Sequence, residues 1–179
     1  MKRSLVYIIS VVLATVSCIN EKTEGADLAA GDLIPDFTVT MNDGTELTGA
    51  MLREAPSCIM FFHTSCPDCR QALPVMQKIY DEYASKGVRF ALISREEEGD
   101  TIAAFWKEND LTMPYSAQKT RKIYNLFAQT RVPRIYVCEK GGTIRFIHTD
   151  APVPEFEELD KEISCISSHF SLFKTRFFE

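Results

Sequence analysis

The chain has 179 residues, of which 45% are hydrophobic and 25% are charged. These are the proportions of an ordinary globular protein, and they exclude a disordered, collagen-like or coiled-coil chain. The length suits one domain and leaves no room for a second independent core. The net charge of −5 disfavours nucleic acid or an anionic membrane surface as a partner.

The first residues have the pattern of an export signal. Lys2 and Arg3 precede an apolar run over residues 5–16, which is short for a helix that crosses a bilayer. A basic start, a short apolar run and small residues before a cleavage point are typical of a secretory signal. We therefore expect residues 1–18 to be a signal peptide.

The end of this signal resembles the lipobox of bacterial lipoproteins. Cys18 directly follows small residues, although Thr15 stands where the lipobox usually has an aliphatic residue. The resemblance implies that Cys18 is lipidated after cleavage and anchors the protein to a membrane; the alternative is a plain signal peptide with a bystander cysteine. Residues 19–30 lack periodicity, and we expect a flexible tether there.

The domain predicted over residues 31–168 opens with a β-hairpin. Apolar and polar residues alternate over 36–40 and 46–48, on either side of an Asp-Gly pair. Residues 58–62 then form a continuous apolar run, which is typical of a strand buried on both faces. A helix over 70–86, stopped by a glycine, and a strand over 88–93 complete a βαβ unit, so the two strands should be parallel.

Two helices and an antiparallel pair of strands are predicted next. One helix should start at Asp100, and apolar residues at helical spacing predict another over 117–128. Strands over 134–138 and 143–147 are joined by a Gly-Gly turn, and a closing helix follows over 154–168. The predicted fold class is α/β, with a mixed central β-sheet flanked by helices and an N-terminal β-hairpin.

The last residues, 169–179, contain four phenylalanines. We expect this aromatic C-terminal tail to pack on the domain as an extension of it.

Two cysteines lie at the junction between the strand over 58–62 and the following helix. Cys66 and Cys69 are separated by Pro67 and Asp68, so that Cys66 lies at or near the helix N-cap and Cys69 one turn further on. The free N–H groups and the positive end of the helix favour a thiolate at the first position. Cys66 is therefore the predicted nucleophile and Cys69 the inward-facing second thiol, while the charge of Asp68 opposes ionisation of both.

The motif at 66–69, Pro74 in the helix, and the Val-Pro pair before the strand over 134–138 together resemble the thioredoxin superfamily. The lipobox-like leader and residues 31–37 narrow the resemblance to the TlpA/ResA kind of thiol-disulfide oxidoreductase, related to redoxins and peroxiredoxins. This resemblance implies a thioredoxin-like fold in the bacterial cell envelope, facing the periplasm. It implies protein thiol or disulfide substrates, an upstream redox donor, and no cofactor besides a redox-active Cys66–Cys69 disulfide.

The resemblance also implies a substrate-binding surface. Pro133 would be a cis-proline that faces the disulfide, and Val132, Pro67 and Asp68 would contact the substrate with it.

Two departures from the family pattern concern the site itself. Thr64 and Ser65 replace the usual aromatic residue before the first cysteine, and Ala72 stands where relatives have a buried acid for proton transfer. Water, Asp68 or His63 would then have to carry protons. From its position alone, however, His63 is expected to be a partly exposed residue at the end of a strand without such a role.

Two rival functions remain open from the sequence. Copper delivery would use Cys66, Cys69 and His148, because two thiolates and an imidazole suit copper. Thiol peroxidase activity requires a threonine three residues before the nucleophile, but His63 is there and Thr64 comes one place late. A non-catalytic scaffold is disfavoured because both thiols lie at the reactive corner.

The other cysteines of the domain have a structural interpretation. Cys58 and Cys138 lie in apolar strands and are expected to be buried core thiols, and Cys165 on the last helix is expected to be structural as well.

Overall fold

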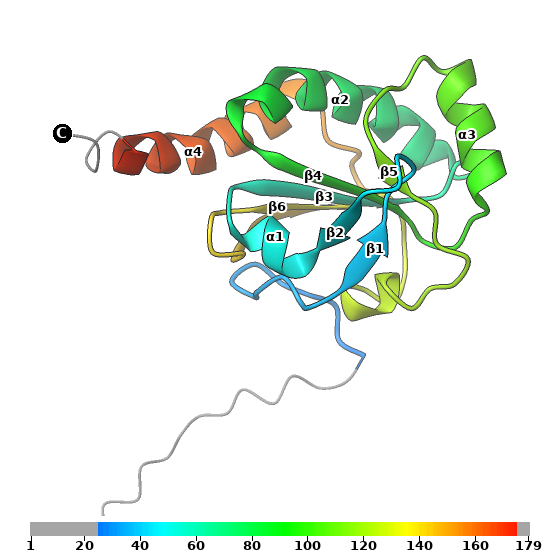
Figure 1. Ribbon diagram of the computed structural model, residues 1–179, viewed down its shortest axis with the longest axis horizontal. Helices are drawn as coiled ribbons and strands as arrows, with labels where there is room; N and C mark the ends of the chain where they lie inside the picture. Colours follow the sequence, from blue (N-terminus) through cyan, green and yellow to red (C-terminus); the bar gives the residue numbers. More distant parts are fainter. Residues whose placement is uncertain (1–24, 175–179) are drawn as a thin grey trace, which may run out of the picture.

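The computed structural model describes residues 25–174, with side chains as far as residue 168. A five-stranded sheet with the order β5-β4-β3-β6-β7 forms its centre (Figure 1). Its strands are β3 (Ser57–Phe62), β4 (Arg89–Ser94), β5 (Tyr115–Ser116), β6 (Arg134–Cys138) and β7 (Ile144–His148). The first three are parallel to one another, whereas β6 is antiparallel to β3 and β7 to β6. The mixed sheet confirms the predicted fold class.

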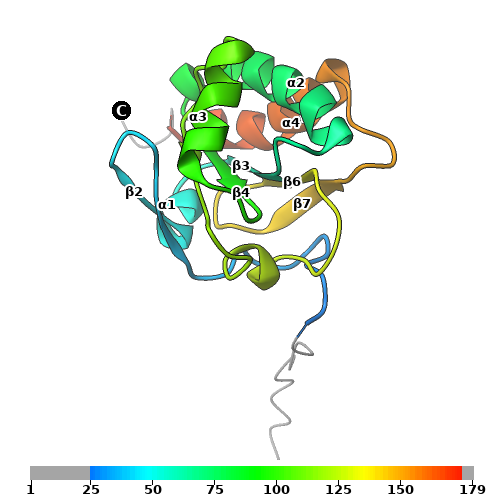
Figure 2. The ribbon, with the colours of Figure 1, turned by 90° about the vertical axis from the view of Figure 1, so that its right-hand side faces the viewer.

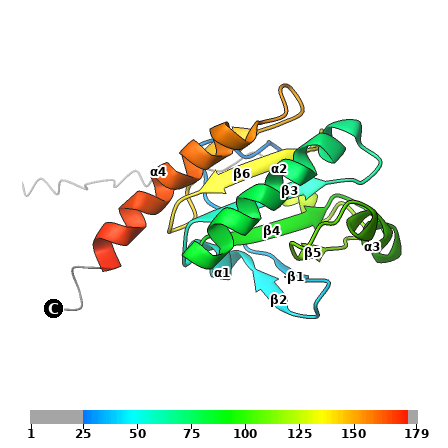
Figure 3. The ribbon, with the colours of Figure 1, turned by 90° about the horizontal axis from the view of Figure 1, so that it is seen from above.

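Helices cover the sheet unequally. The described helices are α1 (Gly49–Arg53), α2 (Pro67–Tyr83), α3 (Gly99–Glu108) and α4 (Phe156–Lys174), with short 3-10 turns η1 (Ala84–Lys86) and η2 (Tyr124–Leu126). Figures 2 and 3 show α2 and α4 on one face of the sheet, while η2 and the first described residues lie against the other. The Tyr83 hydroxyl donates to the Asp160 carboxylate at 2.6 Å and so links α2 to α4.

Strand β3 forms the centre of the core because every one of its residues is buried. Its side chains alternate between the two faces of the sheet. The Phe61 ring packs against a group of three aromatic rings on the η2 side, and Phe62 packs against Trp106 of α3 at 5.1 Å between ring centroids. The three partners of Phe61 are Tyr124, Phe127 and Tyr136.

The N-terminal hairpin is present as a separate two-stranded sheet of β1 (Thr38–Thr40) and β2 (Glu46–Thr48). The Asp43 carboxylate accepts a hydrogen bond from the Thr45 N–H at 2.9 Å, and Gly44 takes the positive φ of 84° that the turn requires. This confirms the predicted hairpin.

Hydrogen bonds tie the segment before and within this hairpin to the central sheet at two places. The Asn42 N–H donates to the Tyr115 carbonyl at 2.7 Å, and the Ser116 hydroxyl donates to the Thr40 carbonyl at 2.7 Å, so the hairpin is bonded to β5. Further back, the Gly31 N–H donates to the Ile144 carbonyl at 2.8 Å, which bonds residues 31–34 to the start of β7.

The prediction of a helix over residues 117–128 is wrong. Only the 3-10 turn η2 forms there, and the residues before it follow a non-helical course. The cause is tertiary, because the Gln118 N–H donates to the Ser94 hydroxyl at 2.7 Å and its carbonyl accepts from the Glu97 N–H at 2.7 Å. These bonds hold residues 117 and 118 beside β4, and helical hydrogen bonding begins only after them, where the Asn125 N–H donates to the Arg121 carbonyl at 2.8 Å.

The predicted helix starts are also shifted. The N-cap predicted at Cys66 is confirmed, since α2 begins at Pro67, although apolar spacing alone indicated a helix only from residue 70. Helix α3 begins at Gly99, so that Glu98 and not Asp100 is its N-cap residue. Where several adjacent residues could serve as the N-cap, the sequence leaves the first residue of a helix open by one or two positions.

The domain is longer at both ends than predicted. Within the expected tether, Leu28 is buried and its N–H donates to the Phe127 carbonyl at 2.8 Å, and Asp27 pairs with Arg134 at 2.6 Å. The domain therefore begins at about Asp27, before residue 31. Helix α4 continues past residue 168 into the expected tail and ends at Lys174.

Some predictions fall on parts that the structure does not describe. The signal peptide, Cys18 and the first part of the tether lie outside the described residues, as do the side chains of the aromatic tail. No helix within residues 25–174 combines the length and the hydropathy needed to cross a membrane.

Candidate active site

Cys66 occupies the N-cap position of α2, at the corner where β3 gives way to the helix. Its backbone is extended, with φ −78° and ψ 122°, and Pro67 follows as the first helical residue. The Cys66 N–H donates to the His63 carbonyl at 3.0 Å, and its half-buried thiol donates to the Val132 carbonyl at 3.2 Å. The sulfur is thus open to solvent on one side and held in place on the other.

Cys69 lies one helical turn further on and is fully buried. Burial raises the pKa of the Cys69 thiol well above its ordinary value, and a backbone hydrogen bond from His63 lowers it by a smaller amount. The neighbouring Cys66 and the charge of Asp68 raise the Cys69 pKa further. Cys69 therefore remains protonated near neutral pH and is buried away from solvent, whereas Cys66 is partly exposed.

The Val132–Pro133 peptide bond is cis, as the resemblance implied. Both residues are buried, and the Val132 carbonyl faces the Cys66 thiol through the hydrogen bond described above. Pro67 is exposed and Asp68 is half-buried. The structure therefore brings Cys66 and Val132 into direct contact, while binding of substrate by these four residues stays a prediction.

A buried carboxylate adjoins the cysteine loop, and the sequence analysis did not identify it. Both oxygens of Glu97 are engaged by Thr64: its N–H donates to one at 2.9 Å, and its hydroxyl donates to the other. Because the Thr64 hydroxyl is occupied by Glu97, it is not offered to the Cys66 sulfur as a peroxidase would need. The run Glu96-Glu97-Glu98 is the sequence signal, but it suggests a solvated surface.

Cys58 and Cys138 are buried within adjacent strands, and no disulfide joins any two cysteines among the described residues. Burial raises the pKa of Cys138 to about 12, against a smaller opposing effect of a hydrogen bond with Ser57. The pKa of Cys58 is also raised, chiefly by burial. Both are core thiols, as expected, whereas Cys165 is exposed on α4.

The buried thiols predict that the fold weakens at alkaline pH. The unfolded chain loses the Cys138 proton near the ordinary thiol pKa of 9.0, while the folded chain, with its raised pKa, keeps the proton until about 12. Stability therefore falls as pH rises through this window, by about 1.4 kcal/mol per pH unit for each such thiol. Urea unfolding between about pH 9.5 and 10.5 should show a shallower fall in Cys138→Ala by that amount.

The control for this measurement is Cys165→Ala. Its thiol is exposed, so the slope of stability against pH should match that of the wild type. Equal slopes for Cys138→Ala and the wild type would contradict the prediction.

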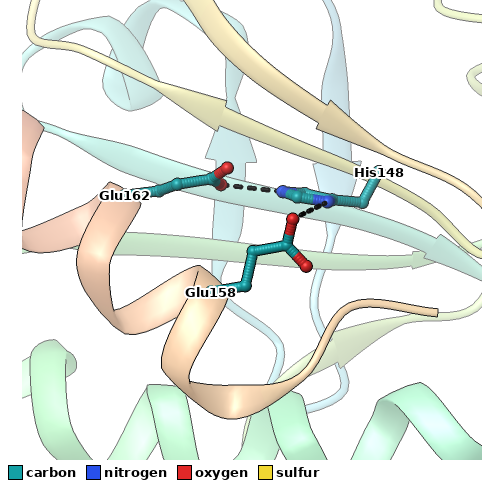
Figure 4. Close-up of side chains that lie close together, drawn as sticks. All are labelled: His148, Glu158 and Glu162. Atoms are coloured by element: carbon teal, nitrogen blue, oxygen red, sulfur yellow. Dashed lines mark hydrogen bonds and ion pairs between the residues drawn. The ribbon is translucent and has the colours of Figure 1, made fainter. Parts of the chain in front are cut away.

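His148 lies at the end of β7 between two carboxylates of α4 (Figure 4). Its Nε2 is 2.7 Å from a Glu162 oxygen and its Nδ1 is 3.9 Å from a Glu158 oxygen. Within the described residues, this is the one group of three or more His, Cys, Asp or Glu side chains close enough to share an ion. The structure therefore does not bring His148 together with Cys66 and Cys69, as the copper-delivery alternative requires.

A partly exposed cysteine at a helix N-cap, bonded to the Val132 carbonyl, with a buried second cysteine one turn later is the arrangement of a thioredoxin-like thiol-disulfide oxidoreductase. The chain belongs to the AhpC/TSA family, which matches residues 30–147.

Individual relatives agree with this assignment. The chain is 30% identical over 155 residues to the thiol-disulfide oxidoreductase ResA of Oceanobacillus iheyensis, covering 80% of this chain and 76% of that protein. It is 26% identical to ResA of Halalkalibacterium halodurans, over 90% of this chain and 94% of the relative. Among solved structures, a thioredoxin-family thiol:disulfide interchange protein from Chlorobium tepidum has a TM-score of 0.66 at 22% identity, over 79% of this chain and 99% of that one. The protein is thus a redoxin of the TlpA/ResA type and a thiol-disulfide oxidoreductase.

Proposed function

We propose that Cys66 and Cys69 form the redox centre and that the protein reduces disulfides in other proteins. The Cys66 thiolate attacks one sulfur of the substrate disulfide, which forms a mixed disulfide and releases the other substrate sulfur as a thiolate. The Cys69 sulfur then attacks Cys66, which gives up the first substrate sulfur. The substrate gains two electrons and two protons, the Cys66–Cys69 pair becomes a disulfide, and an upstream dithiol donor reduces it again.

One observation carries this proposal: the difference in environment between the two sulfurs. The Cys66 thiol is half-buried at a helix N-terminus and its hydrogen bond goes to the Val132 carbonyl, whereas Cys69 is fully buried. A peptide substrate placed along residues 132–133 would therefore meet Cys66 first. The chemistry needs no metal and no organic cofactor, because both electrons come from the cysteine pair.

The direction of electron flow follows from the reduction potential of the pair, which equilibration with glutathione measures. We expect a potential more negative than that of glutathione, together with catalysis of insulin disulfide reduction in the presence of a dithiol donor. Cys66→Ala should abolish both. A potential above that of protein disulfide isomerases, with net oxidation of reduced substrates, would contradict a reducing role.

We further propose that the protein acts in the bacterial cell envelope, exported by residues 1–18 and anchored by a lipid on Cys18. The support is the basic, apolar and small-residue order of the leader. Labelled palmitate should enter the wild type in a bacterial host and should not enter Cys18→Ala, while Cys165→Ala serves as the matched cysteine control. Labelling of Cys18→Ala at the wild-type level, or of neither protein, would contradict the anchor.

A further inference from the structure

Glu97 is a buried carboxylate in the loop that follows β4. It follows β4 in the run Glu96-Glu97-Glu98, and its side chain is 5% exposed. Its two neighbours behave as surface acids: Glu96 pairs with Arg95 at 3.3 Å, and Glu98 pairs with Lys119 at 3.0 Å. Glu97 alone turns inward, and no lysine or arginine among residues 25–168, whose side chains the structure describes, forms an ion pair with it. Removing a carboxylate from water without a cationic partner costs several kcal/mol unless hydrogen bonds replace the lost hydration.

The replacement bonds come from the loop that carries the cysteines. Thr64 donates both its N–H and its hydroxyl to the two oxygens of Glu97. The Glu97 N–H in turn donates to the Gln118 carbonyl at 2.7 Å, so the carboxylate is fixed from behind as well. The Glu97 carboxylate is thus a fixed hydrogen-bond acceptor, and it holds Thr64, which lies two positions before Cys66.

The neighbour of Thr64 is bonded to both cysteines. The His63 carbonyl accepts from the Cys66 N–H at 3.0 Å, and the His63 backbone forms the hydrogen bond that favours the charged form of Cys69. The His63 ring accepts from the Ser65 N–H at 3.2 Å and lies 3.7 Å from the nearer Glu97 oxygen. The segment from His63 to Cys66 is therefore bonded both to the two cysteine residues and, through Thr64, to Glu97.

We propose that Glu97 is a positioning residue of the redox centre, which holds residues 63–66 through Thr64 so that the His63 backbone keeps its bonds to Cys66 and Cys69. This inference rests on the proposed roles of the two cysteines. Resolution of the mixed disulfide requires Cys69 as a thiolate, and a thiolate in a buried place depends on the few donors that reach it. Loss of the hydrogen bonds between Glu97 and Thr64 should therefore slow resolution of the mixed disulfide by Cys69 more than its formation by Cys66.

This role also bears on the absence of an acid at Ala72. The resemblance described above implies a carboxylate on the helix after the second cysteine, where this chain has Ala72, whereas the structure has a buried carboxylate in the loop after β4. It acts through Thr64 and His63 and not by direct contact with a sulfur.

The test compares variants of the run over 96–98 in a single turnover with excess insulin, with the mixed disulfide followed by acid quenching and mass spectrometry. In Glu97→Ala the mixed disulfide should persist about tenfold longer, as expected for the loss of roughly one hydrogen bond to a charged group, while Cys66 alkylation changes less. Glu97→Gln should retain a lifetime within about threefold of the wild type, because an amide can accept from the Thr64 N–H and donate to its hydroxyl. Glu98→Gln is the matched surface control and should have no effect.

Circular dichroism identifies any variant that fails to fold. In that case Thr64→Val, which keeps the shape and the backbone donor but removes the hydroxyl, should still lengthen the lifetime by about threefold or more. Unchanged lifetimes in folded Glu97→Ala or in Thr64→Val would overturn the positioning role. If the wild type itself formed no mixed disulfide through Cys66, the proposed function would fail and not this inference alone.

Discussion

Replacing Cys69 with alanine is expected to turn the protein into a trap for its substrate. Cys66 can still attack a disulfide, but no second thiol remains within reach to release the product. With insulin as substrate, a mixed disulfide should accumulate to near one equivalent and turnover should fall about a thousandfold or more. Mass spectrometry of the alkylated, non-reduced protein measures both the amount and the cysteine involved.

The complementary variant tests the order of the two thiols. Cys66→Ala leaves only the buried Cys69, whose raised pKa keeps it protonated near neutral pH, so neither a mixed disulfide nor turnover is expected. Both variants are best made in a Cys18→Ala, Cys165→Ala background, because the exposed Cys165 could trap substrate by itself. Trapping by Cys66→Ala and not by Cys69→Ala would reverse the assigned roles.

The largest expected loss of stability comes from Phe61 of β3. Its ring lies 5.4, 4.8 and 6.4 Å from the rings of Tyr124, Phe127 and Tyr136, all of them fully buried. Phe61→Ala would remove the shared partner of this cluster and leave a cavity beneath η2, at a cost of about 3–5 kcal/mol. Urea unfolding at neutral pH measures this change in the free energy of unfolding.

A matched control exists on the same side of the sheet. Leu126 of η2 is 43% exposed, so Leu126→Ala should cost less than about 0.5 kcal/mol. A loss below about 1 kcal/mol for Phe61→Ala would mean that the surrounding rings close the space, and the cluster would not hold η2 against the sheet.

The corner that carries the chemistry could be predicted because local signals agree there. An apolar run ends, Pro67 starts a helix, and the two cysteines fall on either side of that start. The conformation of residues 117–128 could not be predicted in this way. The apolar residues there have helical spacing, but hydrogen bonds from Gln118 to other parts of the chain determine the course of the backbone. Where distant partners determine the backbone, spacing alone misleads.

Glu97 illustrates the same limit at the site. Nothing local distinguishes it from Glu96 and Glu98, and its burial depends on Thr64, which is 33 residues earlier in the chain. His148 is a second example, since its two carboxylate partners come from a helix that folds back over β7. A motif whose residues lie within one helical turn of each other can thus be predicted from the sequence, whereas a pair of polar residues that meet only through tertiary contact cannot.

The bonds made by the first described residues have a consequence for how this molecule meets others. Residues 31–34 occupy backbone groups at the start of β7, and Asn42 occupies the backbone groups of Tyr115 in β5, so one short stretch of chain protects parts of both outer strands of the sheet. Open outer strands invite another chain to add itself as a further strand, which leads to aggregation. Removing the chain up to and including Asn42 would therefore be expected to favour self-association.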